Sequence, residues 1–258
     1  MVPRMIAFLG SDILMDSPEG EPWLSHPSPA GPDVATRRNF ACLGQAFIAL
    51  SLAKEAGAAL EAAGLIRMPI RQALSRWPEA TLRPVLKGLG LINWMETAKF
   101  CGACGTALVD PAADLEGGAR SCPACGRPTF PRISPAVIVL VTRGEEILLA
   151  RNAKQPPGGR FGLLAGFVEA GETLEEAAIR EVREEAGIEI GELSYVASQP
   201  WPFPDSLMLA FTARWLSGEA RPDGIEIAEL RWCGRTGLPE IPPQGSIARL
   251  LIDRFALA

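Results

Sequence analysis

Three glutamates in the segment REVREE are the first sign of chemistry in this chain. Glu181, Glu184 and Glu185 are spaced i, i+3 and i+4, so a helix would place their carboxylates on one face. Like charges this close repel one another unless a cation compensates them. Hard carboxylate oxygens that converge on one point suit Mg²⁺ or Mn²⁺. The spacing therefore predicts a divalent-metal site on a helix, with Arg180 placed to orient Glu184 at i+4.

The residues around these glutamates specify the ends of the helix. Thr173 followed by Glu176 forms a capping box, and Gly187 is a natural C-terminal stop. REVREE alone would favour a solvated helix with i,i+4 ion pairs. The whole segment GFVEAGETLEEAAIREVREEAGI, residues 166–188, instead resembles the signature of the Nudix hydrolases. The matching positions are Gly166, Glu172, Arg180, Glu181, Val182, Glu184, Glu185, Gly187 and Ile188.

Four cysteines form a second candidate site. Cys101 and Cys104 lie in CGACG, and Cys122 and Cys125 lie in CPACG, with residues 105–121 between the pairs. Four thiolates suit a closed tetrahedral Zn²⁺ site with a structural role, and soft sulfur disfavours Mg²⁺. A redox CxxC is the alternative, but two pairs at zinc-ribbon spacing argue against it. The sequence therefore predicts a structural zinc ribbon.

The segment SQPWPFPDS, residues 198–206, alternates prolines with aromatic residues. Proline fixes φ, so Trp201 and Phe203 would be held at low entropic cost. A rigid aromatic ledge suits a flat ring such as adenine or nicotinamide. The alternative is a proline-rich connection whose aromatic residues pack into the core.

The three motifs, in this order, resemble the NADH pyrophosphatase branch of the Nudix hydrolases, over about residues 98–256. The resemblance implies Mg²⁺-dependent hydrolysis of the NAD(H) diphosphate to AMP and nicotinamide mononucleotide. A metal-activated water would attack, with Glu185 or Glu184 as the base. One alternative is a Nudix hydrolase that prefers ADP-ribose, dinucleoside polyphosphates or NAD-capped RNA. The alternative of another class is a non-catalytic nucleotide-binding or sensor module.

The resemblance also assigns residues. It implies that Mg²⁺ or Mn²⁺ is held by Glu181, Glu185, the Ala165 carbonyl and Glu226, with Glu229 as the second choice for the last position. Glu184, Arg180 and Glu172 complete the catalytic group. Phe130 stands where many relatives have tyrosine, so stacking would persist without a hydroxyl contact. The implied substrate residues are Phe130, Phe167, Gln199, Pro200, Trp201, Pro202, Phe203, Pro204, Asp205, Ser206 and Ala248.

The elements that must position these residues can be outlined from hydrophobic pattern and turn residues. The fold class that we expect is mixed α+β: a Nudix α/β/α sandwich preceded by a zinc ribbon and a variable N-terminal α+β domain. The expected domains are 1–96, 97–130 and 131–258. Residues 43–63 are ambiguous between helix and strand, and residues 17–33, with the lone His26, read as loop. We expect a hairpin over 136–150, strands within 161–169 and over 193–198, 207–216 and 229–234, and helices over 173–186 and 245–256.

Composition limits the remaining classes. The net charge of −5 over 258 residues argues against a polyanion-binding surface, although an RNA substrate would need a basic surface around the pocket. No apolar run is long enough to span a membrane, and the N-terminus lacks the pattern of a signal peptide. We therefore expect a cytoplasmic protein. The resemblance also implies a homodimer.

Overall fold

The computed structural model describes residues 3–24, 34–110 and 118–257. His26 and part of the predicted loop 17–33 lie outside these residues. The chain divides into two compact units, and each is described by itself. The first unit is Met1–Ile133 with Pro202–Asp205, and the second is Ser134–Trp201 with Ser206–Ala258.

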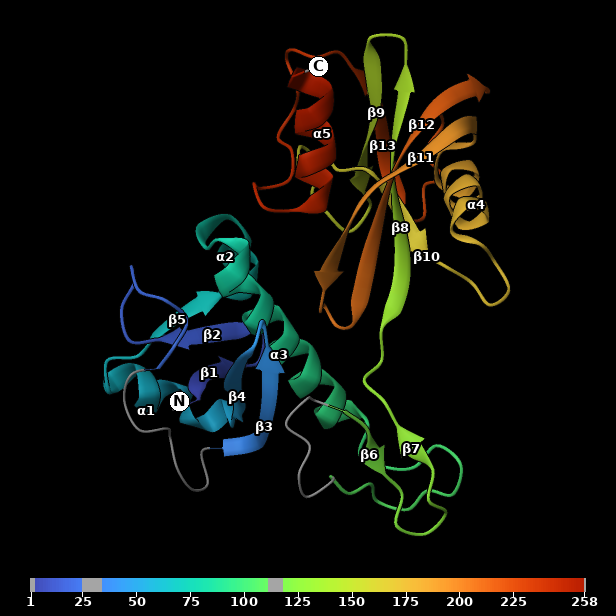
Figure 1. Ribbon diagram of the computed structural model, residues 1–258. Coiled ribbons are helices and arrows are strands. Elements are labelled where there is room, and N and C mark those ends of the chain that lie inside the picture. The colour runs from blue at the N-terminus through green and yellow to red at the C-terminus, as the bar shows by residue number, and fades with distance from the viewer. Residues whose placement is uncertain (1–2, 25–33, 111–117, 258) are drawn as a thin grey trace. The chain divides into compact units, whose positions relative to one another are not determined.

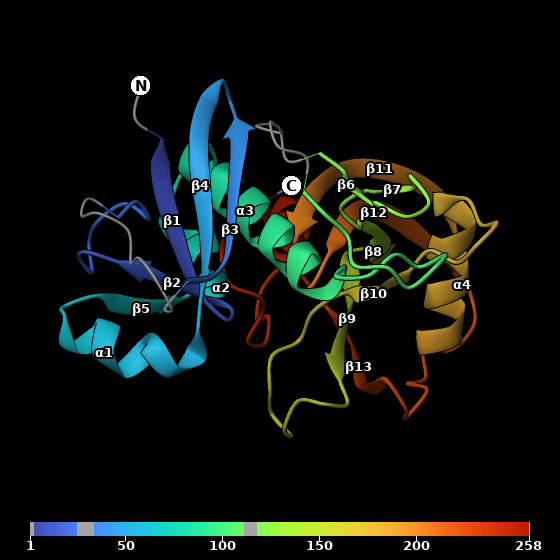
Figure 2. The same cartoon turned by 90° about the horizontal axis from the view of Figure 1, so that it is seen from below.

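The first unit contains, within the described residues, a five-stranded sheet in the order β3-β4-β1-β2-β5. β1 and β4 are parallel, and the other neighbours are antiparallel. The long helix α3 lies across β3 and β4 (Figures 1 and 2). A Cβ at Gly88 of α3 would lie 3.3 Å from Ala49 Cβ of β4, so helix and sheet approach closely. The elements are β1 (Arg4–Leu9), β2 (Asp12–Met15), β3 (Val34–Cys42), β4 (Gln45–Leu52), the 3₁₀ helix η2 (Lys54–Ala56), α1 (Gly57–Ala62), β5 (Ile66–Pro69), α2 (Ile70–Arg76) and α3 (Glu79–Thr97).

The ambiguous segment 43–63 is a strand followed by short helices. β4 forms the strand, and it is paired on both sides, with β1 and with β3. Phe47 through Leu52 are all buried, as expected for a strand in the interior of a sheet whose two faces are covered. The run FIALSL, apolar except for Ser51, shows no clear period, which is why the sequence alone left helix and strand open.

The cysteine segment also belongs to the first unit. It contains the two-stranded ladder of β6 (Arg120–Ser121) and β7 (Pro128–Thr129). The Arg120 guanidinium connects this segment to the end of α3, because it donates to the Ala98 carbonyl at 2.8 Å. It also pairs with Asp110 at 3.0 Å. The small ladder is therefore fixed to its neighbours by charge and hydrogen bonds in addition to the cysteines.

The second unit is a sandwich around a mixed sheet. Its described strands follow the order β11-β12-β8-β9-β13, and β10 pairs with β8. Helices α4 and α5 cover opposite faces (Figure 1). Alternate residues of β8 explain this arrangement: Val137 and Val139 pack toward α4, whereas Ile138 and Leu140 pack toward α5. The elements are β8 (Ser134–Arg143), β9 (Glu146–Asn152), β10 (Leu164–Phe167), α4 (Leu174–Ala186), β11 (Glu189–Trp201), β12 (Ser206–Ser217), β13 (Ile227–Cys233) and α5 (Ile247–Leu257).

The observed elements confirm the predicted mixed α+β class and the predicted hairpin, strands and helices of the second unit. The largest differences concern the strand predicted over 193–198, which begins earlier, at Glu189, and ends later. β11 continues to Trp201 and β12 starts at Ser206, so most of SQPWPFPDS is strand and only Pro202–Asp205 forms the tip. Pro200 is tolerated because β11 is an edge strand, where a missing N–H leaves no ladder partner unsatisfied. None of the described helices has the length and apolarity needed to cross a bilayer.

Candidate active site

Helix α4 begins and ends as its sequence predicts. Thr173 accepts a hydrogen bond from the Glu176 amide at 3.2 Å, and the Glu176 carboxylate accepts one from the Thr173 amide at 2.8 Å. This reciprocal capping box satisfies two amides that the first turn leaves without partners. Gly187 adopts the left-handed conformation (φ 68°) that ends the helix. The buried face, with Ala178 and Val182 against the sheet, fixes how the glutamates project.

Glu181 lies directly against the backbone of β10. A Cβ built on Gly166 would lie only 1.9 Å from Glu181 Cδ, so no larger residue fits at position 166 without moving the carboxylate. Burial raises the pKa of the Glu181 carboxyl, and the neighbouring Arg180 opposes that shift. The glycine of the motif is therefore explained by the space that this carboxylate occupies.

Arg180 organises the glutamates on the exposed side of the site. Its Nε and Nη2 donate to the two Glu172 oxygens at 2.6 and 2.9 Å. Its Nη1 donates to Glu181 at 2.8 Å and to Glu184 at 2.9 Å, and its Nη2 also reaches the Phe167 carbonyl at 2.9 Å. The bidentate contact with Arg180 lowers the pKa of Glu172 to about 2. Arg180 thus connects the loop before α4, the helix and the end of β10.

Glu185 is the buried carboxylate of the site, with 5% of its surface exposed. One oxygen accepts a hydrogen bond from the Ala165 amide at 3.2 Å. Burial, together with the negative charges of Glu181, Glu226 and Asp223, raises the pKa of Glu185 to about 8, and the hydrogen bond from the Ala165 amide opposes this shift. A buried carboxylate in such surroundings stays ionised at neutral pH only with a compensating positive charge.

The downstream acid of the site is better matched by Glu226 than by Glu229. The negative charge of Glu226 raises the pKa of both Glu181 and Glu185. Glu229 is instead engaged by Arg231 at 2.8 Å and Arg151 at 3.2 Å, which lower its pKa. This geometry favours the first of the two predicted candidates.

Sequence reasoning missed Asp223. Its carboxylate accepts hydrogen bonds from the amides of Ile225, Glu226 and Ile227 at 2.8–3.1 Å, and this turn sets the backbone that carries Glu226. Its charge also raises the pKa of Glu185. The Asp-Gly pair at 223–224 was the available signal, because Asp-Gly is typical of tight turns.

The donor set fits a hard divalent cation. Glu181, Glu185 and Glu226 offer carboxylate oxygens, which Mg²⁺ and Mn²⁺ prefer, and their mutual repulsion is the charge that such a cation would neutralise. Among the residues that the structure describes, however, only the four cysteines bring three or more ligand atoms within 4.8 Å of one another. The glutamates are more widely spaced because like charges repel and because Arg180 holds Glu181.

The predicted substrate residues of the second unit lie on β10, β11, β12 and α5. Phe167, next to the motif glycine, is 55% exposed, as a stacking surface requires. Gln199 is used internally: its amide donates to the Gly245 carbonyl and its oxygen accepts from the Ile247 amide, both at 2.8 Å. Gln199 thereby ties β11 to the start of α5, where Ala248 lies partly buried against the core. Ser206 is buried opposite Trp201 in the β11–β12 ladder.

The rest of the predicted substrate set belongs to the first unit. Phe203 lies under the guanidinium of Arg71, with 5.1 Å between the Arg71 Cζ and the ring centroid. Asp205 pairs with Arg132 at 3.5 Å. Phe130 is 65% exposed. Phe203 therefore has a partner from α2.

The four cysteines have the geometry of a metal site. Sγ–Sγ distances are 3.7 Å for Cys101–Cys125, 3.5 Å for Cys104–Cys122 and 3.7 Å for Cys104–Cys125. A tetrahedral zinc with Zn–S bonds of about 2.3 Å has S–S edges of about 3.8 Å, whereas a disulfide needs about 2.05 Å. Contacts with the side chain and backbone of Thr106 lower the pKa of the Cys104 thiol to about 6, whereas at Cys125 the neighbouring thiols outweigh a backbone hydrogen bond at Arg127 and raise the pKa to about 11. The cluster therefore suits zinc binding and is not a set of disulfides.

Each cysteine pair lies in the same tight turn. Gly105 and Gly126 both adopt φ 72°, and their amides donate to the carbonyls of Cys101 and Cys122, both at 2.9 Å. A Cβ at either glycine would be strained in this left-handed conformation. The repeated sequence CGACG and CPACG therefore produces two matching knuckles that face each other.

We predict that the purified protein contains one zinc ion per chain and that Cys122→Ser loses it. Cys122 is buried in the cluster, so a serine would remove a thiolate ligand from a site that has little other core. Elemental analysis and thermal unfolding measure both effects. Cys42→Ser, outside the cluster, is the control and should retain zinc. Full zinc content in Cys122→Ser would refute the four-cysteine site.

Comparison with known proteins agrees with this geometry. The NUDIX domain family matches residues 132–255. The chain is 51% identical over 162 residues to the NAD-capped RNA hydrolase NudC of Pseudomonas aeruginosa, a match that covers 63% of this chain and 57% of that relative. It is 42% identical over 209 residues to the protein of the same name from Deinococcus radiodurans, covering 80% of this chain and 71% of the relative.

A solved structure gives the same fold. The crystal structure of a NUDIX hydrolase from Nitrosomonas europaea aligns with a TM-score of 0.52 at 28% sequence identity, over 61% of this chain and 90% of that one. The matched family region contains β8–β13, α4 and most of α5, and therefore the whole glutamate cluster. With the capped glutamate helix, the close approach of Glu181 to Gly166 and the cysteine cluster, these similarities show that the chain belongs to the NudC branch of the Nudix hydrolases.

Proposed function

We propose that this protein hydrolyses the diphosphate bond of NAD(H), releasing AMP and nicotinamide mononucleotide, with Mg²⁺ or Mn²⁺ as the catalytic ion. The observation that carries the proposal is the buried Glu185 carboxylate, which shares its site with Glu181 from the same helix and with Glu226 from the segment before β13. A non-catalytic binding module would have no need to bury and crowd these charges, because such burial costs stability.

The residues divide the chemical work. Glu181, Glu185 and Glu226, together with the Ala165 carbonyl, would hold the divalent ion, which when bound supplies charge neutralisation and a more acidic water. Glu185 is our first choice as the base that accepts the proton from the attacking water, and Glu184 is the second. Arg180 holds Glu184 and Glu181 in place and is itself anchored by Glu172. No covalent intermediate is required.

The substrate class rests on the aromatic and proline residues and on the relatives. Phe167 offers an exposed ring next to the motif glycine in the chain, and Trp201 lies at the end of β11. The relatives from P. aeruginosa and D. radiodurans are both named NAD-capped RNA hydrolases, so an NAD-capped RNA 5′ end is the second candidate substrate.

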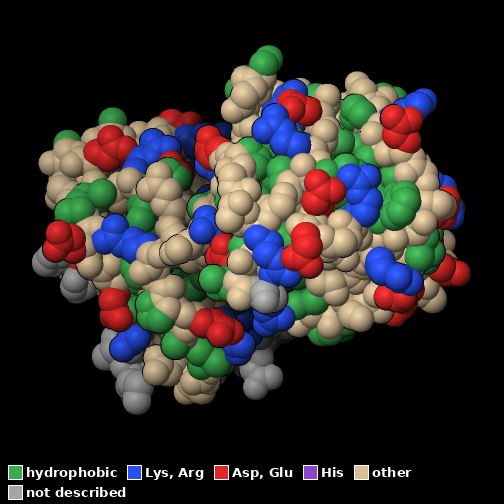
Figure 3. All heavy atoms as spheres, turned by 90° about the horizontal axis from the view of Figure 1, so that it is seen from above, with side chains coloured by type: hydrophobic (Ala, Val, Ile, Leu, Met, Phe, Trp, Pro, Cys, Tyr) green, Lys and Arg blue, Asp and Glu red, His purple; other side chains and the backbone are tan. Residues whose placement is uncertain are grey.

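The surface charge bears on this choice. On the face shown in Figure 3, acidic and basic side chains of the described residues are interspersed. Within each unit, the described residues on this face form no extended basic tract of the kind that the phosphates of an RNA body would contact.

A product assay tests the proposal. NADH, ADP-ribose, diadenosine tetraphosphate and an NAD-capped RNA are each incubated with Mg²⁺ and with EDTA. Fastest release of AMP and reduced nicotinamide mononucleotide from NADH, abolished by EDTA, is the expected result. Inert NADH beside a hydrolysed dinucleotide would keep the Nudix chemistry and reject the proposed substrate. Absence of any turnover would favour the binding module.

Our remaining proposals concern the role of the zinc, the oligomeric state, the location and the domains of the protein. We propose that the zinc is structural, because four thiolates leave no open coordination position. We propose a homodimer, a cytoplasmic location, and three domains over residues 1–96, 97–130 and 131–258. Light scattering of the purified protein measures the oligomeric state directly.

A further inference from the structure

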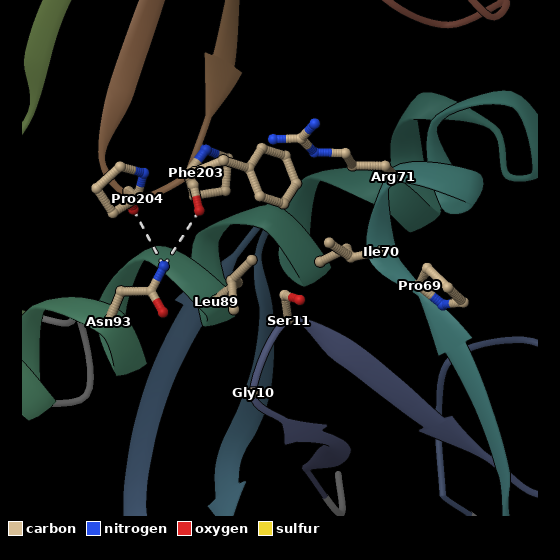
Figure 4. Close-up of a pocket in the computed structure, with 10 residues that line it drawn as sticks. Gly10, Ser11, Pro69, Ile70, Arg71, Leu89, Asn93, Phe203 and Pro204 are labelled. Carbon is tan, nitrogen blue, oxygen red and sulfur yellow. Dashed lines mark hydrogen bonds between the residues drawn. The ribbon is translucent and has the colours of Figure 1, made fainter. Parts of the chain in front are cut away.

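One amide side chain of α3 binds two backbone carbonyls in the tip of the β11–β12 hairpin, Pro202–Asp205. Asn93 Nδ2 donates to the Pro202 carbonyl at 3.1 Å and to the Pro204 carbonyl at 3.0 Å (Figure 4). The asparagine amide has two N–H groups, one for each carbonyl. Because both bonds end on backbone oxygens, they fix the path of the tip whatever side chains it carries.

Other contacts seat the tip less specifically. Pro202 is buried against α3, where a Cβ at Gly90 would lie 3.6 Å from the Pro202 Cβ, an ordinary contact distance. Beside the tip lies a pocket of about 480 Å³, lined in part by Ile70, Leu89 and Phe203 (Figure 4). Arg71 covers the Phe203 ring and Arg132 pairs with Asp205, but these contacts are made by side chains of the tip, whereas Asn93 binds its backbone.

The tip is only one residue from groups that the proposed function assigns to the substrate. Trp201 precedes it and Ser206 follows it, and the two face each other in the β11–β12 ladder. A change in the path of residues 202–205 therefore changes the positions of both. Fixing such a loop before the substrate arrives reduces the ordering cost of binding.

We propose that Asn93 is a positioning residue for substrate binding, which holds the hairpin tip so that Trp201 and Ser206 are preorganised. This inference rests on the proposed function. Asn93 acts through the loop and does not touch the glutamates, so its loss should weaken binding and leave the chemical step unchanged. A merely structural hydrogen bond would change thermal stability without separating KM from kcat.

The test uses three substitutions in the full-length protein. Asn93→Ala removes both bonds, and Asn93→Asp replaces the donor by a charge that the two carbonyls repel. Asn93→Gln retains an NH₂ donor on a longer side chain. Arg83→Ala is the control, because Arg83 makes an exposed ion pair with Glu79 elsewhere on α3.

We expect Asn93→Ala to raise KM for NADH about tenfold, the order that two lost hydrogen bonds give, with kcat within about twofold of wild type. Asn93→Asp should raise KM further, Asn93→Gln should recover part of the loss, and Arg83→Ala should match wild type. Hydrogen exchange at the Phe203 and Asp205 amides should be faster in Asn93→Ala. Unchanged KM in all three Asn93 variants, or a fall confined to kcat, would overturn the inference.

Failure of this inference is distinguishable from failure of the proposed function. A wild-type protein that does not hydrolyse NADH rejects the proposed function, and KM for the dinucleotide that is hydrolysed then becomes the readout. If no dinucleotide is hydrolysed, both proposals fail. If wild type hydrolyses NADH but exchange at the tip is the same in Asn93→Ala and wild type, only the role of Asn93 is rejected.

Discussion

Replacing Glu185 with glutamine is expected to lower kcat for NADH by about 10³-fold or more, while the fold is retained. Glutamine has almost the same shape as glutamate, but it cannot accept a proton from water and is a poor ligand for Mg²⁺. Glu185 is buried, and its side chain accepts a hydrogen bond from the Ala165 amide, a bond that the glutamine oxygen can still accept. The substitution therefore removes charge and basicity with little change in packing.

Stability separates this loss from misfolding. Burial raises the pKa of Glu185 to about 8, so ionising this group in the metal-free protein opposes folding. The stabilisation that comes from protonated Glu185 is fully present below the pKa that this group has in the unfolded chain, and it is lost as the pH rises toward 8. Without divalent ions at pH 8, Glu185→Gln should thus melt at a temperature no lower than that of wild type. Addition of Mg²⁺ should raise the melting temperature of wild type more than that of Glu185→Gln.

Glu175→Gln is the matched control for this prediction. Glu175 is an exposed glutamate in the first turn of the same helix, outside the group that Arg180 organises. Its replacement should leave turnover of NADH within about twofold of wild type, as is usual for a surface substitution. A near-normal rate in Glu185→Gln would reject Glu185 as both base and ligand, and the same measurement on Glu184→Gln would then test the second candidate.

The glutamate helix was predictable because its information is local. A capping box, a glycine stop and an i, i+3, i+4 spacing each act within a few residues, and the structure realises all of them in α4. The cysteine cluster was predictable for a different reason. Two CxxC knuckles can share a tetrahedral ion only if their four sulfurs come together, and the observed sulfur spacing matches that requirement.

What the sequence could not predict depends on contacts between distant residues. The role of Asp223 depends on a turn that places it near Glu185 in space. β11 extends through Pro200 because it is an edge strand, which no local pattern reveals. Likewise, Asn93 is an ordinary polar residue of an amphipathic helix until the hairpin tip is placed beside it.

Gly166→Ala should lower kcat/KM for NADH by about 10²-fold or more. The cause would be purely steric, because the added methyl group occupies the place of the Glu181 carboxylate. Gly166 is not among the residues with positive φ, so alanine is compatible with its backbone. Its Cβ would, however, lie 1.9 Å from Glu181 Cδ and 2.0 Å from Glu181 Oε1. Because β10 is held in the ladder with β8, the side chain of Glu181 must move instead. Its carboxylate is then displaced from those of Glu185 and Glu226.

The displaced carboxylate predicts a specific kinetic signature. Without Glu181 in position the divalent ion loses a ligand, so the Mg²⁺ concentration for half-maximal activity should rise together with the loss of turnover. Gly162→Ala is the control, because a Cβ there meets nothing within 4 Å and its φ is also not positive. Wild-type activity and Mg²⁺ dependence in Gly166→Ala would show that Glu181 needs no fixed position. Loss of activity in both variants would instead indicate that this segment tolerates no side chain at all, and the steric explanation would fail.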